Sequence, residues 1–249
     1  MKSDTALKGD PMVRASIAMA VYNGEKYLPA QLDSIVGQMG GDDELVISYD
    51  RSSDGTLELI QGYAGRDTRV RVVMNPSSGI TGNFENALKN CAGEYIFISD
   101  QDDVWAPEKI EKVLECFEAT GADMVVHNGV HTDEDLHPVT DSFFEIYPIV
   151  GRSLIRNIVS ARVSGCTTAF TKRIRDLIVP IPRIQDYDHW NLCVAQAAGK
   201  VAYLDEELIL HRLHGGNATM PGGQRRPLKD IIRSRWGLIT NLIKRSRQA

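Results

Sequence analysis

The chain has 249 residues, of which 43% are hydrophobic and 24% are charged. This length and balance exclude wholesale disorder, collagen-like repeats and coiled-coil rods, and fit one large domain or two small ones around a sizeable core. The net charge of −5 divides unevenly: residues 225–249 hold eight Lys/Arg and one acid, a local balance of +7, whereas residues 1–224 have a balance of −12. The acidic body argues against broad nucleic-acid binding, so we expect no nucleic-acid partner.

The sequence also predicts a cytoplasmic protein. No apolar run approaches the length of about 18 residues that indicates a transmembrane helix. Residues 1–14 lack the apolar stretch of a signal peptide. The four cysteines are scattered without a CxxC pair, which indicates reduced thiols.

The first hundred residues alternate between short apolar runs and helical periodicity. We expect strands at 15–21, 44–48, 69–74 and 95–99, separated by helices at about 25–39, 56–63 and 83–90. Such alternation predicts an α/β fold with right-handed crossovers and a mostly parallel sheet. Ligands of such sheets bind beyond the carboxyl ends of the strands, so Tyr22-Asn23, Asp50 and Asp100 to Asp103 should meet at one edge.

The pattern changes after Trp105. We expect a helix over about 107–119, a strand at 122–127, an irregular stretch over 129–160, a strand-like segment at 163–170, a helix over about 187–198, and short strands at 201–204 and 208–211.

Asp100, Asp102 and Asp103 lie within four residues, directly after the apolar strand 95–99. Carboxylates this close repel one another unless a cation joins them. Mg²⁺ binds one or two carboxylates together with substrate phosphates. A solvated acidic loop is the alternative, but the position after a buried strand of an α/β pattern favours a metal site.

Three segments, in order, resemble the family 2 glycosyltransferases, and most of all a subgroup with bacterial rhamnosyltransferases. They are Ala20-Val-Tyr-Asn-Gly-Glu-Lys-Tyr-Leu28, Asn83-Phe-Glu-Asn-Ala-Leu88 and Gly93-Glu-Tyr-Ile-Phe-Ile-Ser-Asp-Gln-Asp-Asp-Val-Trp105. The resemblance implies a GT-A fold with a Rossmann-like sheet. It divides the chain into a flexible N-terminus at 1–14, a GT-A domain at 15–220 with a nucleotide half (15–105) and an acceptor half (106–220), and a basic amphipathic tail at 221–249.

The same resemblance implies a divalent metal, Mg²⁺ or Mn²⁺, on the diphosphate of a nucleotide-sugar donor. Asp102, Asp103 and His214 would hold the metal, although His214 could instead touch the diphosphate or serve as a structural hydrogen-bonding group. The donor-binding residues would be Val21, Tyr22, Asn23, Asp50, Asn83, Asp100 and Arg212. Arg212 and His214 belong to a segment that matches the family's Arg-x-His-Gly-Gly-Asn ending.

The sequence departs from the family pattern at the ends of the first two predicted strands. Val21 replaces a usual Thr, and Tyr49-Asp50-Arg51-Ser52 replaces Asp-Asp-Gly-Ser. Tyr49 could stack on the base or simply pack near the end of its strand.

Sugar transfer with inversion needs a general base on the acceptor side. Tyr187-Asp188-His189-Trp190 aligns with the family's His-Asp-Trp-Trp and would place Asp188 as this base, with Asp186 as the rival. A helix cap is the structural alternative. Gly165, Cys166 and Trp190 would line the acceptor and sugar, and Cys166 is interpreted as a small buried residue rather than a nucleophile.

The tail carries apolar residues at helical spacing, among them Trp236, with Lys and Arg largely off the stripe. Such a pattern favours a membrane-surface helix over residues 225–249. A helix packed on the body or on another subunit is the alternative.

The sequence therefore predicts a metal-dependent inverting glycosyltransferase. It would move a sugar from a nucleoside diphosphate donor, such as dTDP-rhamnose, to a glycan or lipid-linked glycan in bacterial surface polysaccharide synthesis, in the cytoplasm or at the inner face of the cell membrane. Two other hypotheses remain: a nucleotide-sugar-binding protein without catalysis, and a sugar nucleotidyltransferase, which normally needs a Gly-rich basic loop that the segment 21–31 lacks.

Overall fold

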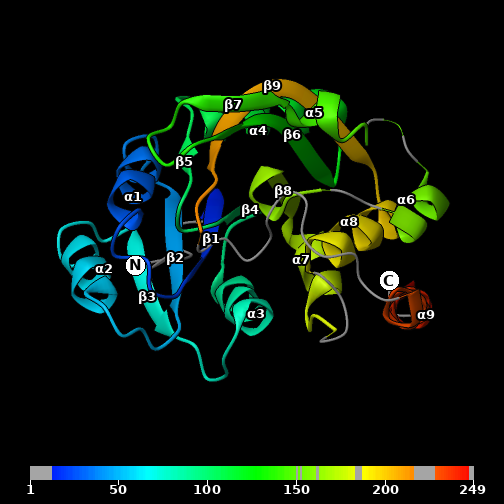
Figure 1. The fold of residues 1–249 in the computed structure, drawn as a ribbon, viewed down its shortest axis with the longest axis horizontal. Helices are drawn as coiled ribbons and strands as arrows, with labels where there is room; N and C mark the ends of the chain where they lie inside the picture. Colours follow the sequence, from blue (N-terminus) through cyan, green and yellow to red (C-terminus); the bar gives the residue numbers. More distant parts are fainter. Residues whose placement is uncertain are drawn as a thin grey trace, which may run out of the picture.

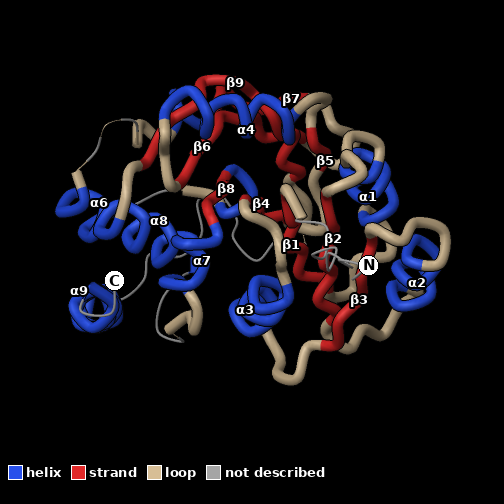
Figure 2. The backbone as a smooth tube through the Cα atoms, turned by 180° about the vertical axis from the view of Figure 1, so that it is seen from behind, coloured by secondary structure: helices blue, strands red, loops and turns tan. Residues whose placement is uncertain are grey.

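The computed structural model describes residues 13–149, 151, 153–160, 163–182, 187–215 and 228–246. Within these residues one curled sheet runs through the molecule in the strand order β3-β2-β1-β4-β8-β6-β9-β5, and β7 pairs with β6 (Figure 1). Helices flank the sheet on both sides (Figure 2). The mostly parallel half and the mixed half of this sheet correspond to the two halves of the chain.

The first half follows the predicted alternation. Its elements are β1 (Ala15–Val21), α1 (Leu28–Val36), β2 (Asp43–Tyr49), α2 (Thr56–Ala64), β3 (Val70–Met74), α3 (Ile80–Asn90) and β4 (Tyr95–Ser99). β1 pairs in parallel with β2 and β4, and β2 pairs in parallel with β3. The carboxyl ends of these strands therefore meet at one edge, as predicted.

Alternation along the strands decides which helix covers which face. Ile17 and Met19 of β1 belong to the same buried cluster as α1 and α2. Ala18, between them, belongs to the cluster of α3. Because successive strand residues point to opposite faces, an unbroken apolar run is what a strand covered on both sides requires.

The second half lacks the regular alternation of strands and helices. Its elements are β5 (Val104–Trp105), α4 (Lys109–Thr120), β6 (Met124–Thr132), β7 (Pro138–Ser142), α5 (Phe143–Ile146), α6 (Leu154–Ser160), a 3₁₀ turn (Gly165–Thr167), β8 (Thr168–Thr171), α7 (Lys172–Ile178), α8 (Tyr187–Ala198), β9 (Val201–Arg212) and α9 (Leu228–Ser246). β8 runs antiparallel between β4 and β6 and so joins the two halves.

Three expectations for this half are wrong. The stretch 129–160 is not irregular, because it contains the end of β6, β7, α5 and α6. The segment 163–170 begins as a 3₁₀ turn, not as a strand. The two short strands at 201–204 and 208–211 are one strand, β9, whose register with β6 shifts where Asp205 and Glu206 interrupt the apolar pattern.

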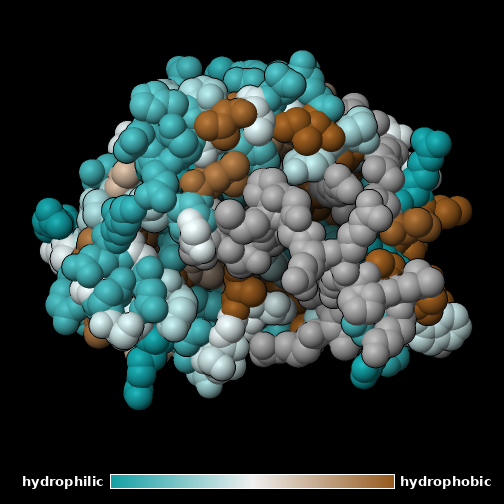
Figure 3. All heavy atoms as spheres, in the orientation of Figure 1, coloured by the Kyte–Doolittle hydropathy of each residue, from teal (hydrophilic) through white to brown (hydrophobic). Residues whose placement is uncertain are grey.

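Helices α6, α7, α8 and α9 pack together beside the sheet, with α9 at the outer side (Figures 1 and 2). Trp190 of α8 is fully buried among them. In Figure 3 the face over α1 and α2 is mostly hydrophilic, whereas hydrophobic spheres gather at the right edge, where Figure 1 draws α6.

Candidate functional site

The end of β1 is the meeting point of three predicted donor-binding residues. Val21 is buried, and its carbonyl oxygen accepts hydrogen bonds from the backbone N–H of Asp50 at 2.9 Å and from Nδ2 of Asn83 at 3.0 Å. The structure therefore brings together groups that lie up to 62 positions apart in the sequence. Val21 contributes its backbone to this junction, and its side chain belongs to the core.

Asp50 anchors the loop that precedes α3. Its Oδ2 accepts a hydrogen bond from the backbone N–H of Gly79 at 2.9 Å, and its Oδ1 accepts one from Arg51 at 3.1 Å. Gly79 has a φ of +86°, a conformation that glycine adopts without strain. A carboxylate held by backbone N–H groups is a rigid part of the strand-end edge.

The loop after β1 is held by amide side chains. The backbone of Tyr22 both donates to and accepts from the side chain of Gln101, at 2.8 and 2.9 Å. Asn23 adopts a left-handed φ of 48°, and its Oδ1 accepts from the backbone N–H of Ser53 at 2.9 Å. The ring of Tyr22 remains exposed. The edge thus combines a fixed backbone with an aromatic ring open to a ligand.

Tyr49 packs in the core rather than facing this edge. Its ring is buried in the same cluster as α1 and α2, and its hydroxyl accepts a hydrogen bond from the backbone N–H of Ser52 at 2.9 Å. Of the two interpretations of Tyr49, the structure favours packing over stacking on a base.

Asp102 and His214 come into contact, although 112 positions separate them. Asp102 Oδ2 lies 2.8 Å from His214 Nε2. Arg212 donates from Nε to the carbonyl oxygen of Asp102 at 2.9 Å and lies 4.8 Å from the centre of the Tyr27 ring, which also packs against His214. The predicted Arg212 and His214 therefore both reach the acidic loop.

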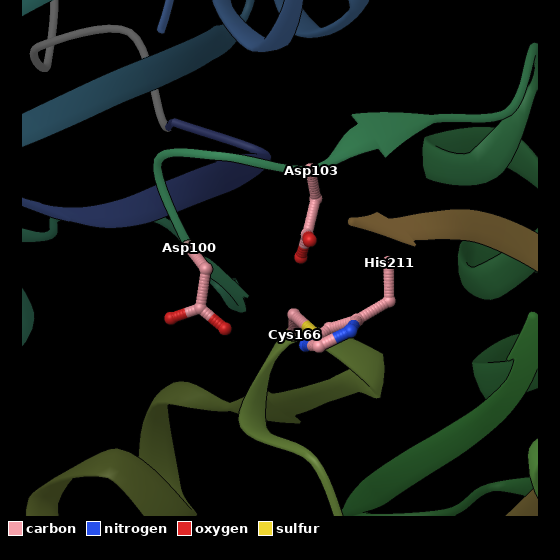
Figure 4. A group of neighbouring side chains, drawn as sticks. All are labelled: Asp100, Asp103, Cys166 and His211. Atoms are coloured by element: carbon pink, nitrogen blue, oxygen red, sulfur yellow. The ribbon is translucent and has the colours of Figure 1, made fainter. Parts of the chain in front are cut away.

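Asp103 faces a different cluster. It is fully buried, its Oδ1 accepts from the backbone N–H of Arg212 at 3.1 Å, and its Oδ2 has no hydrogen-bond partner among the described residues. Potential ligand atoms of Asp100, Asp103, Cys166 and His211 lie within 4.8 Å of one another (Figure 4). The carboxylate of Asp103 points toward this group in Figure 4.

Burial shifts the pKa values of the ionisable groups in and beside this cluster. Burial, with the charges of Asp103 and Asp102, raises the pKa of Asp100 to about 7, and burial with the charge of Asp102 raises the pKa of Asp103 to about 7. Lys109, whose Nζ donates to the carbonyl oxygen of Cys166 at 2.9 Å, has its pKa lowered by burial to about 7. Burial and the charges of Asp103 and Asp100 raise the pKa of the Cys166 thiol well above its ordinary value, which disfavours the thiolate form that a nucleophile needs.

The donor chemistry of these residues fits a hard divalent cation. Carboxylate oxygens and a neutral imidazole nitrogen are suitable ligands for Mn²⁺, and carboxylate oxygens for Mg²⁺. A bound cation would also offset the crowded negative charge that raises the pKa values of Asp100 and Asp103. The free oxygen of Asp103 and the Asp102–His214 contact are two places where the acidic loop offers such ligands.

Asp188 lies in the first turn of α8, next to Tyr187. Burial raises the pKa of the Tyr187 hydroxyl well above its ordinary value, with the charges of Asp100 and Asp188 beside it and a hydrogen bond to Asp188. Tyr187 therefore links the region of the predicted base to the predicted donor site. Asp186, the rival base, lies outside the described residues.

Gly165 sits against this carboxylate. A Cβ atom on Gly165 would lie 2.5 Å from Oδ1 of Asp188 and 2.7 Å from the hydroxyl oxygen of Tyr187. Cys166 is buried and faces Asp100 and Asp103. Trp190, also expected to line the acceptor site, is fully buried, and its Nε1 donates to the carbonyl oxygen of Ile178 at 2.8 Å.

Sequence reasoning missed Lys109 and His211. His211 directly precedes the predicted Arg212 on β9, so strand alternation was a signal that it would point to the other face. Lys109 gives no such signal, because a lysine at the start of a helix is normally exposed.

The tail forms α9, and one side of this helix packs on the body. Ser234, Leu238 and Leu242 are buried, and Arg235 donates from Nη1 to Nδ1 of His189 at 2.8 Å. No helix within the described residues is long and apolar enough to cross a membrane. Residues 221–227 and 247–249 of the predicted tail lie outside the described residues.

Comparison with known proteins identifies the family. The family model for glycosyl transferase family 2 matches residues 16–178, and the chain belongs to this family. A putative teichuronic acid biosynthesis glycosyltransferase, TuaG of Bacillus subtilis, is 26% identical over 70% of this chain and 69% of its own length. A dTDP-rhamnosyl transferase, RfbG of Shigella flexneri, is 35% identical over 39% of this chain and 36% of its own length.

Length separates this chain from some relatives. It spans 67% of an uncharacterised glycosyltransferase of Nostoc and 35% of the glycosyltransferase GlyA of Streptococcus pneumoniae, each at 24% identity. Among solved structures, TarS 1–349 of Staphylococcus aureus in complex with UDP-GlcNAc superposes with a TM-score of 0.72 at 21% identity, over 92% of this chain and 67% of that one. This likeness confirms the predicted GT-A fold.

Proposed function

We propose that this protein is a metal-dependent inverting glycosyltransferase that uses a nucleoside diphosphate sugar. The observation that carries the proposal is the convergence of Asp50, Asn83 and the acidic loop at the carboxyl ends of parallel strands, with Asp188 held against Gly165, next to the Cys166 that faces Asp100 and Asp103. Membership of the family supports glycosyl transfer as the reaction.

The donor would lie along the strand-end edge. Val21, Tyr22, Asn23, Asp50 and Asn83 form the nucleotide end of the site. Asp100 and Arg212 would act at its diphosphate end. Arg212 already positions the acidic loop through its hydrogen bond to the carbonyl oxygen of Asp102. The relative named as a dTDP-rhamnosyl transferase supports a deoxyhexose donor, and the TarS complex with UDP-GlcNAc shows that this fold also accepts a uridine nucleotide.

Asp102, Asp103 and His214 would hold the Mg²⁺ or Mn²⁺ ion, with Oδ2 of Asp103 as the ligand atom that has no hydrogen-bond partner among the described residues. When bound, the ion would neutralise the charge that builds up on the departing diphosphate. Asp102 and His214 already contact each other, so the chain brings its own ligands into place before the donor arrives.

Asp188 would take the proton from the acceptor hydroxyl as its oxygen attacks the anomeric carbon. The bond to the nucleoside diphosphate breaks as the new glycosidic bond forms, with inversion at that carbon. Gly165 leaves room beside the carboxylate, where a larger side chain would collide with it. The acceptor would be a glycan or a lipid-linked glycan of bacterial surface polysaccharide synthesis, met by a cytoplasmic enzyme at the inner face of the membrane through residues 225–249.

Substitution of the metal ligands tests the proposal. In Asp102→Asn, affinity for UDP or dTDP in the presence of Mn²⁺ should fall about 10- to 100-fold, while affinity without metal stays unchanged. Calorimetric titration of both states measures this difference. Asp176→Asn is the matched control, because Asp176 is 63% exposed and pairs only with Arg175 among the described residues. Equal nucleotide affinity with and without Mn²⁺ in the natural chain would remove the metal from the proposal.

Release of nucleoside diphosphate from a donor panel separates the alternatives. The proposal predicts acceptor-dependent release of UDP or dTDP. A nucleotidyltransferase would instead release pyrophosphate from a nucleoside triphosphate, and a binding protein without catalysis would bind donors and release nothing.

A further inference from the structure

Helix α9 has one wide apolar stripe, of which only the inner side is buried. This inner side, with Leu238 and Leu242, packs against the body. Ile232, Trp236 and Ile243 stand at i, i+4 and i+11, on the outer side of the same stripe, and are 60%, 70% and 50% exposed. Packing on the body therefore explains only the inner side of the predicted stripe.

Helix α6 extends the outer side. Ile155 and Val159 are one helical turn apart and are 76% and 66% exposed. The carbonyl oxygen of Val159 accepts a hydrogen bond from Nε of Arg235 at 3.2 Å, so α6 lies along the edge of α9. We call the five residues Ile155, Val159, Ile232, Trp236 and Ile243 the outer apolar face. Five of the nine exposed large hydrophobic residues described in the chain belong to it.

The charge around this face decides what would cover it. Arg156, Arg233 and Lys244 are exposed beside it, and the described parts of α6 and α9 carry a single acid, Asp230. Two copies meeting through this face would bring these cations together. An anionic bilayer instead complements them, and apolar side chains with a Trp and flanking cations are the pattern of an interfacial helix.

The helix that carries the proposed base is bound to both helices of this face. His189, next to Asp188, is buried and lies between α6 and α9. Because arginine only donates, Nδ1 of His189 accepts from Arg235 at 2.8 Å, and Nε2–H donates to the carbonyl oxygen of Asn157 at 2.7 Å. The outer apolar face and the start of α8 are therefore connected by one buried side chain.

We propose that α6 and α9 together form a docking platform for an anionic phospholipid bilayer, and that His189 fixes the acceptor side of the site to this platform. This inference rests on the proposed function for the role of Asp188. It deepens that proposed function, because it places the acceptor at the lipid surface. It also extends the expected membrane contact beyond residues 225–249, to a helix some 70 positions earlier in the chain.

Tryptophan fluorescence of the natural chain tests the docking directly. Of its three tryptophans, Trp105 and Trp190 are buried and Trp236 is exposed. Vesicles of phosphatidylglycerol with phosphatidylcholine should shift the emission to shorter wavelength, and brominated acyl chains should quench it. Vesicles of phosphatidylcholine alone should act much more weakly. Emission unchanged by anionic vesicles would overturn the proposal.

The double variant Ile155→Ser/Val159→Ser tests whether α6 contributes to the docking platform. Removal of two exposed apolar side chains should weaken vesicle cosedimentation by about tenfold or more. Val139→Ser is the matched control, because Val139 is 52% exposed on β7, away from the platform. Wild-type binding in the double variant would overturn the composite platform. A dimer that the double substitution dissociates, seen by sedimentation velocity without lipid, would assign the face to a second copy and also overturn it.

The link through His189 has its own test. His189→Leu removes both hydrogen bonds, and transfer to a lipid-linked acceptor should fall about tenfold while nucleotide affinity is unchanged. His189→Gln, which can still accept and donate, should recover most of this loss. Equal loss in both variants would contradict the link. Nucleotide binding in lipid-free solution fails only if the proposed function fails, so the two failures are distinguishable.

Discussion

The two sides of the site are held in place by different means. At the strand-end edge, backbone groups hold the polar side chains: Gly79 donates to Asp50, Val21 accepts from Asn83, and Arg212 donates to Asp103. On the proposed acceptor side, Asp188 is positioned by the hydroxyl of Tyr187 and by the lack of a side chain on Gly165, which lets the carboxylate approach the backbone closely. Sheet register therefore determines where the polar groups of the strand-end edge lie, whereas individual side chains determine where Asp188 lies.

This difference has a physical consequence. Backbone hydrogen bonds between paired strands persist through most side-chain substitutions, so the nucleotide side should be tolerant outside its contact residues. The acceptor side depends on close packing around one carboxylate, and interiors transmit small displacements rather than absorb them. We expect single substitutions near Asp188 to change turnover strongly and nucleotide binding little.

The largest expected effect is that of Asp188→Asn. Removal of the general base should lower turnover by about 10²- to 10⁴-fold. Nucleotide affinity should remain at the wild-type value, because Asp188 lies on α8 and not on the parallel strands that form the strand-end edge. Acceptor-dependent release of nucleoside diphosphate measures the first quantity, and calorimetry the second. Full turnover in this variant would show that another group acts as the base. Asp186 is the candidate nearest in sequence.

Gly165→Ala should have the second largest effect on turnover. The new methyl carbon would lie 2.5 Å from Asp188 Oδ1, so the carboxylate or the turn must move. A displacement on the order of 1 Å at a reacting group lowers turnover by about 10- to 100-fold. Gly41→Ala is the matched control, because a Cβ atom there meets nothing within 4 Å. Equal turnover in the two variants would show that the acceptor side is as tolerant as the strand-end edge.

The same contrast explains what could be predicted from the sequence. The first half follows from periodicity, because each strand is an unbroken apolar run between turn residues. The stretch 129–160 was missed because its elements are short and exposed: α5 has four residues, and β7 has an exposed side along most of its length. Such segments take their structure from β6, with which β7 pairs, and not from a pattern of their own.

The site was predictable where it lies on motifs. Asp102 and His214 were paired by resemblance, and the structure brings them together. The cluster of Asp100, Asp103, Cys166 and His211 was not predicted, because it depends on β8 entering antiparallel between β4 and β6. The burial of Trp190 was not predicted, because a motif preserves the residue type and does not say whether the ring faces a ligand or the core.

Tyr49→Phe tests the tolerance of the strand-end edge. The substitution removes the acceptor of the Ser52 N–H hydrogen bond and keeps the buried ring, so the free energy of unfolding should fall by about 1 kcal/mol. Because the ring packs in the core, the ratio of affinities for UDP and dTDP should not change. Urea unfolding and nucleotide titration measure these two quantities, and an altered base preference would place Tyr49 against the base after all.

The smallest expected effect lies in the nucleotide half, far from the site. Arg69 donates to the carbonyl oxygens of Val36 and Gly40 at the end of α1, and to Asp67. Its guanidinium lowers the pKa of Asp67 below the ordinary value. A depressed carboxyl pKa stabilises the fold above the unfolded-state pKa, and this stability is lost as the pH falls through the folded-state pKa.

Asp67→Asn should therefore lower the free energy of unfolding at pH 7 by less than about 1 kcal/mol. The difference from wild type should shrink as the pH is lowered from about 5 to 3, in urea unfolding at each pH. Turnover at pH 7 should be unchanged, and a loss of turnover would show that the end of α1 is coupled to the strand-end edge.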